Sequence, residues 1–366
     1  NIQDIDLNEV KIQAAKLHLM YFAHFINTKL VFKNFHRAYY NIITLFAKGI
    51  IKKLIIQMPP QHGKSELSSK LLPAFLLGKN NSLKIGILSY STTIARTFNT
   101  AIQNIMKSQE YAMLFPDASL NVARETMTKD YCETIQHGSV TAVGRGGSLT
   151  SKSLDVVIMD DLYKDYAEGN SPLIRENVWQ WYTSVVSTRL HNDSQQLIVF
   201  TRWHEDDLIG RLEKENKIID ITNFETQYND AYWYRVNFPA LMNHAKTEID
   251  KRELNEPLWT ERHSYEKLIQ QQKLNPLQFL ALFQGEPNNK ESYLYNTFKT
   301  YNNIAEYGTI KNINAYIDTA DGGEDYLCAV VYVIVESSEM YYNAESRRNE
   351  RLLFFLIKDI LKHLLM

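Results

Sequence analysis

The sequence predicts an α/β fold in which a mostly parallel sheet is flanked by helices. Short apolar runs typical of buried strands recur at residues 54–58, 84–89, 154–159 and 196–200. Segments with helical spacing of apolar residues lie between these runs. Because parallel strands need long crossover connections, strands that alternate with helices favour a sheet covered on both faces.

The composition limits the class of protein. The chain has 366 residues, of which 45% are hydrophobic and 22% are charged, as expected for one large or two smaller globular domains. The formal net charge is −2, so any contact with DNA must come from local patches. Two cysteines cannot build a disulfide framework, which fits a reducing cytosol. No apolar run reaches the ~20 residues of a membrane span, so no membrane partner is expected.

Residues 1–50 precede the first predicted strand and read as mostly helical. Apolar residues recur at helical spacing over 10–26, and a second helix is predicted at about 36–48. Another helix is predicted after the second strand, at 91–109, and one more at 171–187.

The first strand leads into a loop that ends in Gly63-Lys64-Ser65, followed by a helix-compatible segment that Pro73 interrupts. Strand, loop and helix in this order are typical of a phosphate-binding loop, although Met58 stands where the full motif has its first glycine. Glycine lets backbone N–H groups point at phosphate oxygens, lysine reaches the β- and γ-phosphates, and serine offers a hydroxyl to Mg²⁺. The alternative is an ordinary strand-turn-helix. The residues assigned to ATP are Gln61, His62, Gly63, Lys64, Ser65 and Glu66.

The strand at 154–159 ends in two acids, Asp160 and Asp161. In a nucleotide-hydrolysing fold, one acid at the carboxyl end of a strand helps to hold Mg²⁺, and the next can polarise the attacking water. We assign Asp160, together with Ser65, to the metal and Asp161 to the water. The pair of motifs predicts a P-loop NTPase.

Two further positions are candidates for catalysis. Thr201 follows the strand at 196–200 and either senses the γ-phosphate or caps a helix. Arg145 lies in a glycine-rich loop and is a candidate arginine finger. The alternatives for Arg145 are a solvated residue or a contact with the DNA backbone, and Lys152 is also a candidate for such a DNA contact. Arg189 and Arg202 compete with Arg145 for the finger role.

The pattern changes towards the C-terminus. Residues 241–275 are rich in charge and predict a solvated connector with one helix. A strand at 313–318 and a hairpin partner at 328–335 follow, and a helix is predicted at 346–365. Asp318 and Asp325 stand at a strand end and in the next turn, where carboxylates of a two-metal nuclease gather.

In combination, these motifs resemble the large terminase subunit of tailed bacteriophages. The matching pieces, in the order of that family, are residues 59–66, Ser89-Tyr90-Ser91, Phe115-Pro116, 144–161, 179–190, 201–208, 256–259, 279–287 and Asp318-Thr319-Ala320. The resemblance covers about residues 30–335. It implies an ATPase with Mg²⁺ that translocates double-stranded DNA into a procapsid, and an RNase-H-like nuclease that uses Mg²⁺ or Mn²⁺.

The resemblance also implies partners and a domain order. Portal protein, a small terminase subunit and a homo-oligomeric ring in the host cytoplasm, transiently at the procapsid portal, are expected. The expected domains are an N-terminal helical lead-in at 1–50, a P-loop ATPase domain at 51–240, a connector at 241–310 and an RNase-H-like α/β domain at 311–366. This last domain is expected to be partial and truncated, because few residues follow Asp318. The alternatives are another P-loop DNA helicase or repair ATPase, or a non-catalytic prophage remnant.

Overall fold

The computed structural model of the protein describes residues 7–123, 125–149, 153–287, 308–318, 328–343 and 348–356. The chain divides into two compact units, Asn1–Tyr293 and Leu294–Met366.

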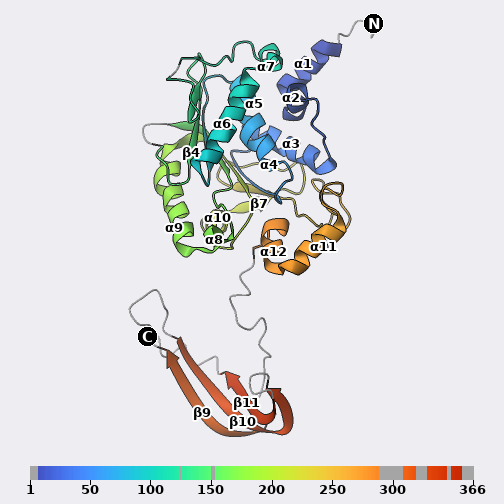
Figure 1. Cartoon of the computed structure of the whole chain (residues 1–366), viewed down its shortest axis with the longest axis vertical. Helices are drawn as coiled ribbons and strands as arrows, with labels where there is room; N and C mark the ends of the chain where they lie inside the picture. Colours follow the sequence, from blue (N-terminus) through green and yellow to red (C-terminus); the bar gives the residue numbers. More distant parts are fainter. Residues whose placement is uncertain are drawn as a thin grey trace. The chain divides into compact units, whose positions relative to one another are not determined.

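The first unit, whose helices and strands are drawn in Figure 1, is built on an eight-stranded sheet. The order of its strands is β3-β4-β2-β5-β6-β1-β8-β7. Neighbouring strands are parallel except for β3 and β4, so the predicted mostly parallel sheet is confirmed. The strands are β1 Lys53–Gln57, β2 Lys84–Ser89, β3 Tyr131–Glu133, β4 Ser139–Gly144, β5 Leu154–Asp160, β6 Leu190–Phe200, β7 Ile218–Asp220 and β8 Trp233–Asn237.

Helices cover both faces of this sheet, as predicted. The α-helices are α1 Leu7–Leu17, α2 Leu19–Ile26, α3 Asn34–Ala47, α4 Lys64–Glu66, α5 Leu72–Lys79, α6 Thr92–Met106, α7 Gln109–Leu114, α8 Tyr166–Asn170, α9 Pro172–Trp181, α10 Leu208–Glu215, α11 Tyr265–Leu274 and α12 Pro276–Gln284. The π-helical turns η1 Leu67–Leu71 and η2 Tyr182–Val186 and the 3₁₀ turn η3 Ser187–Arg189 extend some of them. Among the helices in the described ranges, none has the length and apolar character that a bilayer crossing requires.

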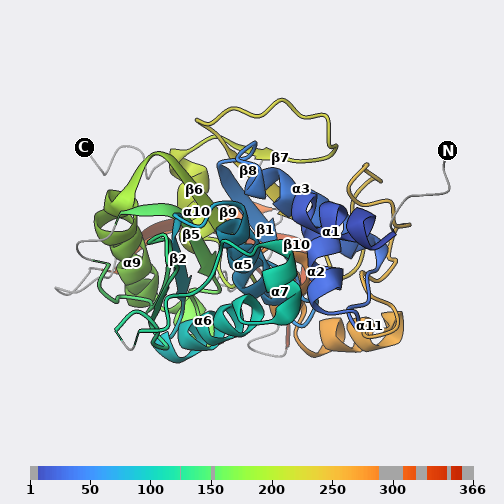
Figure 2. The same ribbon diagram turned by 90° about the horizontal axis from the view of Figure 1, so that it is seen from above.

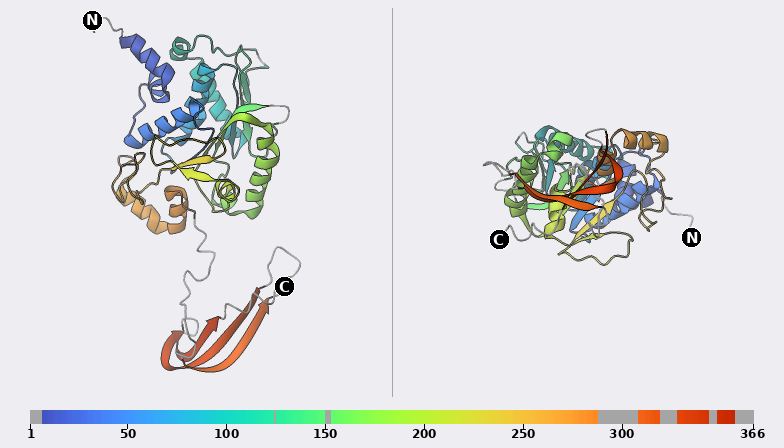
Figure 3. Two further views of the ribbon diagram at one scale, coloured as in Figure 1. Left: turned by 180° about the vertical axis from the view of Figure 1, so that it is seen from behind. Right: turned by 90° about the horizontal axis from the view of Figure 1, so that it is seen from below.

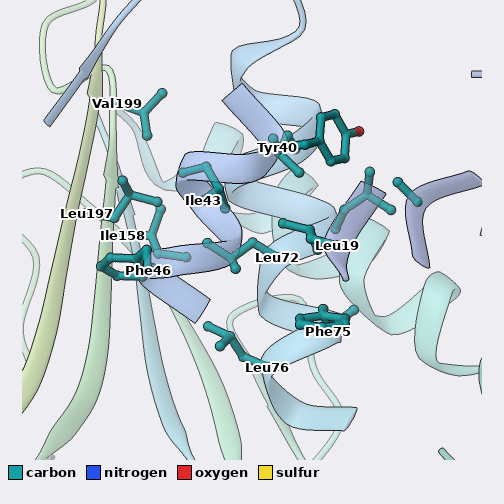
Figure 4. Packing of buried hydrophobic residues seen from close by; sticks show 14 of the residues in the cluster. Leu19, Tyr40, Ile43, Phe46, Leu72, Phe75, Leu76, Ile158, Leu197 and Val199 are labelled. Atoms are coloured by element: carbon teal, nitrogen blue, oxygen red, sulfur yellow. The ribbon is translucent and has the colours of Figure 1, made fainter. Parts of the chain in front are cut away.

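Alternate residues of each central strand enter different cores, as a pleated strand requires. In β6, Leu197 and Val199 join a core formed with α3, α5 and α6, whereas Ile198 and Phe200 join a second core formed with α9 and α10. Figure 2 shows α9 on one side of β2 and β5 and α5 on the other. Figure 4 shows Phe46 of α3 directed at Ile158 and Leu197 of the sheet. Burial of both faces explains why these strands are continuous apolar runs.

Helix boundaries follow local capping chemistry. The predicted helix at 10–26 divides at His18, whose side chain accepts a hydrogen bond from the Met20 N–H at 3.1 Å and so caps α2. Asp207 caps α10, with its Oδ1 accepting from the Gly210 N–H at 3.0 Å. Thr201 therefore does not cap this helix, so the interpretation of Thr201 as a helix cap is wrong.

The second unit contains a three-stranded antiparallel sheet with the order β11-β10-β9 (Figure 3). Its strands are β9 Thr309–Asp318, β10 Cys328–Asn343 and β11 Arg348–Leu356. The predicted strand and its hairpin partner are confirmed, but the helix predicted at 346–365 is wrong over the described part, because 348–356 pairs with β10. A short apolar run such as 352–356 has no periodicity that distinguishes a helix from a strand. This segment forms a strand because it pairs with the edge of β10.

Candidate nucleotide-binding site

The candidate site lies at the carboxyl ends of three neighbouring strands. The strand order places β6 between β1 and β5, with all three parallel. The loop at 58–63 follows β1, Thr201 follows β6, and Asp160 and Asp161 end β5. Because carboxyl ends of parallel strands meet at one edge, residues separated by more than 130 positions come together there.

The phosphate loop has the backbone that its sequence predicts. Gly63, directly before α4, has a φ of +86° in the left-handed region. Glycine adopts this conformation readily because it has no side chain. The Tyr39 hydroxyl of α3 donates a hydrogen bond to the Lys64 carbonyl at 3.0 Å and so supports the first turn of α4. Met58, at the place of the missing glycine, is buried, and its N–H donates to the Phe200 carbonyl at 3.4 Å. This position thus continues strand pairing, and the tight turn comes later in the loop.

Lys64, Asp161 and Thr201 form a compact cluster. Lys64 Nζ lies 2.8 Å from Asp161 Oδ2 and also donates to Thr201 Oγ1. The Thr201 N–H donates to Asp161 Oδ1 at 2.7 Å. Asp161 has a φ of +43°, a conformation that Asp adopts more readily than most residues. The structure therefore brings together three of the predicted catalytic side chains.

Ser65 and Asp160 have the chemistry of a magnesium site. Ser65 Oγ donates to Asp160 Oδ1 at 3.0 Å, and Ser69 donates to Asp160 Oδ2. Burial and the charge of Asp161 raise the pKa of Asp160 to about 6, against the lowering effects of Lys64 and the two serines. Hard oxygen donors such as these fit Mg²⁺, which keeps waters and takes one or two protein ligands. No cluster of three or more acidic, His or Cys ligands occurs among the described residues.

A cavity of about 430 Å³ opens at this cluster. Its lining includes five of the six predicted nucleotide-binding residues, all except His62, together with Asp161 and Thr201. Six further lining residues were not among the predicted site residues, namely Pro60, Tyr90, Tyr163, Lys164, Trp203 and Leu282. Lys164 and Tyr163 follow the acidic strand closely, so proximity to Asp161 was the only available signal for them.

A second cavity of about 360 Å³ lies beside the first, and Gly63 and Glu66 line both. One wall comes from residues 29–32 and helix α3, and the other from Trp259 and Arg262 of the predicted connector. The Arg262 guanidinium lies 5.2 Å from the centre of the Trp259 ring. Nothing in the local sequence of this segment indicated a place beside the phosphate loop.

His62, alone among the six residues assigned to ATP, does not line the larger cavity. Its ring is fully buried and stacks on His263 with centroids 4.6 Å apart. Its Nδ1 lies 2.8 Å from the Pro60 carbonyl, and burial lowers its pKa to about 4. The imidazole is therefore neutral at pH 7 and supports the loop from within the core.

The candidate arginine finger is engaged elsewhere. Arg145 donates two hydrogen bonds to the Glu168 carboxylate, at 2.7 and 3.1 Å, and one to the Leu162 carbonyl at 2.9 Å. It does not line the larger cavity. Of its competitors, Arg202 is buried in an ion pair with Asp207 at 2.6 Å, and Arg189 precedes β6 in a 3₁₀ turn.

Three further predicted residues, Asp318, Asp325 and Lys152, cannot be placed in the site. Asp318 is the last residue of β9, where its backbone pairs with Cys328, and the structure describes its backbone only. Asp325 and Lys152 lie outside the described residues.

A family model described as terminase large subunit, T4-like virus type, N-terminal, matches residues 55–300, which is more than half of the chain. The chain belongs to the terminase large subunit family. No curated protein matches this terminase sequence. Among solved structures, the ATPase domain of the Thermus phage P74-26 large terminase is 16% identical, with 66% of this chain and 93% of that chain covered and a TM-score of 0.44.

Two other large terminases give similar values. The HK97 bacteriophage large terminase is 12% identical, with 81% of this terminase and 59% of that chain covered and a TM-score of 0.42. The large terminase of the thermophilic bacteriophage D6E, solved in complex with ADP, is 9% identical, with 87% and 68% covered and a TM-score of 0.36.

Proposed function

We propose that this terminase large subunit hydrolyses ATP and uses the free energy to translocate viral double-stranded DNA into a procapsid. The observation that carries the proposal is the convergence of Lys64, Ser65, Asp161 and Thr201 on one cavity, with Asp160 buried beneath it. Family membership supports the packaging role. The ADP in the D6E terminase supports the choice of an adenine nucleotide.

The triphosphate would occupy the larger cavity and the base the second one. Backbone N–H groups from Gly63 to Ser65 and the start of the helix attract phosphate oxygens. Lys64 would divide its charge between Asp161 and the β- and γ-phosphates. The flat wall of Trp259 offers an aromatic surface to a nucleobase.

Ser65 and Asp160 would hold the Mg²⁺ that accompanies the nucleotide. When bound, the cation neutralises charge that develops on the phosphoryl group. Asp161 would accept a hydrogen bond from water and, as the water oxygen bonds to the γ-phosphorus, take its proton. The bond from the γ-phosphorus to the β–γ bridging oxygen breaks, and ADP and inorganic phosphate leave.

Thr201 would report the loss of the γ-phosphate. Its hydroxyl accepts from Lys64, and its N–H donates to Asp161, so it contacts both groups whose partners change on hydrolysis. The adjacent Arg202–Asp207 pair joins the end of β6 to the start of α10. A displacement of Thr201 is therefore transmitted to a helix.

The other functions follow from the family resemblance. Double-stranded DNA, portal protein, a small terminase subunit and a homo-oligomeric ring are the proposed partners, in the host cytoplasm and at the procapsid portal. Arg145 would act as the finger after exchanging Glu168 for a phosphate. An RNase-H-like nuclease with Asp318 and Asp325 as ligands of Mg²⁺ or Mn²⁺ is proposed for the second unit. Cleavage of plasmid DNA that Asp318→Ala abolishes would support the nuclease, and cleavage that persists in this variant would contradict it.

The decisive experiment is steady-state ATP hydrolysis with Mg²⁺, with and without linear duplex DNA. Lys64→Ala should abolish hydrolysis, whereas Lys79→Ala, an exposed lysine at the end of α5, should leave it unchanged. DNA stimulation supports a translocating motor. Strand unwinding would favour a helicase instead. If the chain neither binds nor hydrolyses ATP, a non-catalytic prophage remnant becomes the better explanation.

A further inference from the structure

A buried serine behind the phosphate loop contacts the carboxylate assigned to the metal. Ser69 Oγ donates to Asp160 Oδ2, and Ser65 Oγ donates to Asp160 Oδ1 at 3.0 Å. Ser69 is 0% exposed and Asp160 is 2% exposed. Two hydroxyls from one helix therefore hold the two oxygens of a single carboxylate that comes from β5.

The helix makes a wide turn where Ser69 lies. In η1 the Leu72 N–H donates to the Leu67 carbonyl, five residues earlier. Pro73 follows directly, and in a regular α-helix its ring would collide with the Ser69 carbonyl four residues earlier. The π-helical turn removes this conflict, and such turns recur at functional sites. The expected interruption at Pro73 is thus a widened turn within a continuous helical segment from Lys64 to Lys79.

The neighbouring serine provides an internal comparison. Ser68 is also 0% exposed, but its hydroxyl donates to the Lys64 carbonyl at 2.8 Å. Ser68 Oγ lies 3.3 Å from Ser69 Oγ. The two serines therefore share their burial and their helix, and they differ in whether the hydroxyl contacts Asp160.

We propose that Ser69 is a positioning residue, which fixes the orientation of the Asp160 carboxylate for the divalent cation of the nucleotide complex. This proposal rests on the proposed function, because the cation arrives with a nucleotide. Ser69 occupies Oδ2, so Oδ1, which accepts from the Ser65 hydroxyl, is the oxygen that would contact the cation. Without this hydrogen bond, the buried carboxylate can rotate and its Oδ2 loses its donor.

The test is Mn²⁺ binding to the full chain, measured from the electron paramagnetic resonance signal of free Mn²⁺ with and without ADP. The ADP-dependent part isolates the nucleotide site from any Mn²⁺ bound elsewhere. Ser69→Ala should weaken ADP-dependent Mn²⁺ affinity about tenfold, as is typical when a partner of a metal-ligating carboxylate is removed. Ser68→Ala should leave this affinity within about twofold, and ADP affinity in EDTA should be equal in all variants.

Three results would overturn the inference. The first is a Ser69→Ala protein with Mn²⁺ affinity equal to that of the wild type, and the second is an equal loss in Ser68→Ala. If Ser69→Ala does not fold, Ser69→Cys is used instead, because it keeps about the same volume with a weaker hydrogen-bond donor. The third overturning result is an unchanged Mn²⁺ affinity in this Ser69→Cys protein. A wild-type chain that binds no Mn²⁺ with ADP would instead overturn the proposed function itself.

Discussion

Lys64 Nζ lies 2.8 Å from Asp161 Oδ2, so the first residue of α4 and the residue after β5 neutralise each other. The other oxygen of this carboxylate accepts the Thr201 N–H at 2.7 Å. Asp161 is thus held at once by the start of α4 and by the residue after β6. Its orientation is set before any water is bound, which is what a group that orients a nucleophile requires.

Asp161→Asn should lower kcat for ATP hydrolysis by about 10²- to 10⁴-fold, because the amide cannot take the proton of water. Nucleotide affinity should not fall and should rise slightly, since Lys64 then loses its competing anion. Asp155→Asn is the control, because Asp155 lies on the same strand and contacts Lys84 and His191 away from the cavity. Steady-state kinetics and a fluorescent ADP analogue measure the two quantities. A variant with more than a third of wild-type kcat would exclude Asp161 as the proton acceptor.

Arg145→Ala should lower the free energy of unfolding by about 1.5–3 kcal/mol, because a bidentate pair with Glu168 and the bond to Leu162 are lost. Urea unfolding followed by tryptophan fluorescence measures this loss. All five tryptophans lie before residue 294, so the signal reports the first unit.

The Arg145–Glu168 pair also separates two roles of the arginine. If Arg145 acts on a phosphate, it should still matter when Glu168 is absent. The Arg145→Ala/Glu168→Ala double variant should then hydrolyse ATP at least 10³-fold more slowly than Glu168→Ala alone. Equal rates would show that the arginine only holds the loop that carries Tyr163 and Lys164.

Trp259→Ala should weaken ATP binding about five- to tenfold and leave binding of inorganic triphosphate unchanged, because it removes an aromatic wall of the second cavity only. Isothermal titration calorimetry of both ligands provides the comparison. Tyr21→Ala is the control, since this aromatic ring is 51% exposed on α2 and lines neither cavity. An equal loss for both ligands would place the base elsewhere.

Asp206 should make stability depend on acidic pH. Burial alone would raise the pKa of Asp206, but hydrogen bonds and charges from Arg211 and Lys214 lower it to about 2. Because this value is below that of the unfolded chain, the ionised carboxylate stabilises the fold above about pH 4, and this stabilisation is lost as the pH falls towards 2.

Asp206→Asn should therefore be less stable than the wild type at pH 7, by about 1 kcal/mol after solvent screening. The difference should shrink between pH 4 and pH 2 in urea unfolding series. Glu215→Gln, an exposed change on α10, the helix that carries Arg211 and Lys214, should show no such trend. A difference that stays constant down to pH 2 would assign the effect to packing.

Much of the first unit could be predicted because its signals are local. The strands at β1, β2 and β5 were predicted to within a residue, since fully buried parallel strands are continuous apolar runs. The phosphate loop and the two acids were recognisable because each motif lies within eight residues. Strand β11 was mistaken for a helix, because its identity depends on pairing with β10.

The sequence by itself determined which residue types the site contains and that they follow strands, because strand ends and turn residues are encoded locally. Only the tertiary structure decided their partners. The strand order brought Thr201 into contact with both Lys64 and Asp161, the widened turn before Pro73 brought Ser69 to Asp160, and the connector placed Trp259 beside the loop. Arg145 likewise met Glu168 only in the folded chain. Such contacts depend on which elements pack together, and this choice minimises the free energy of the whole core.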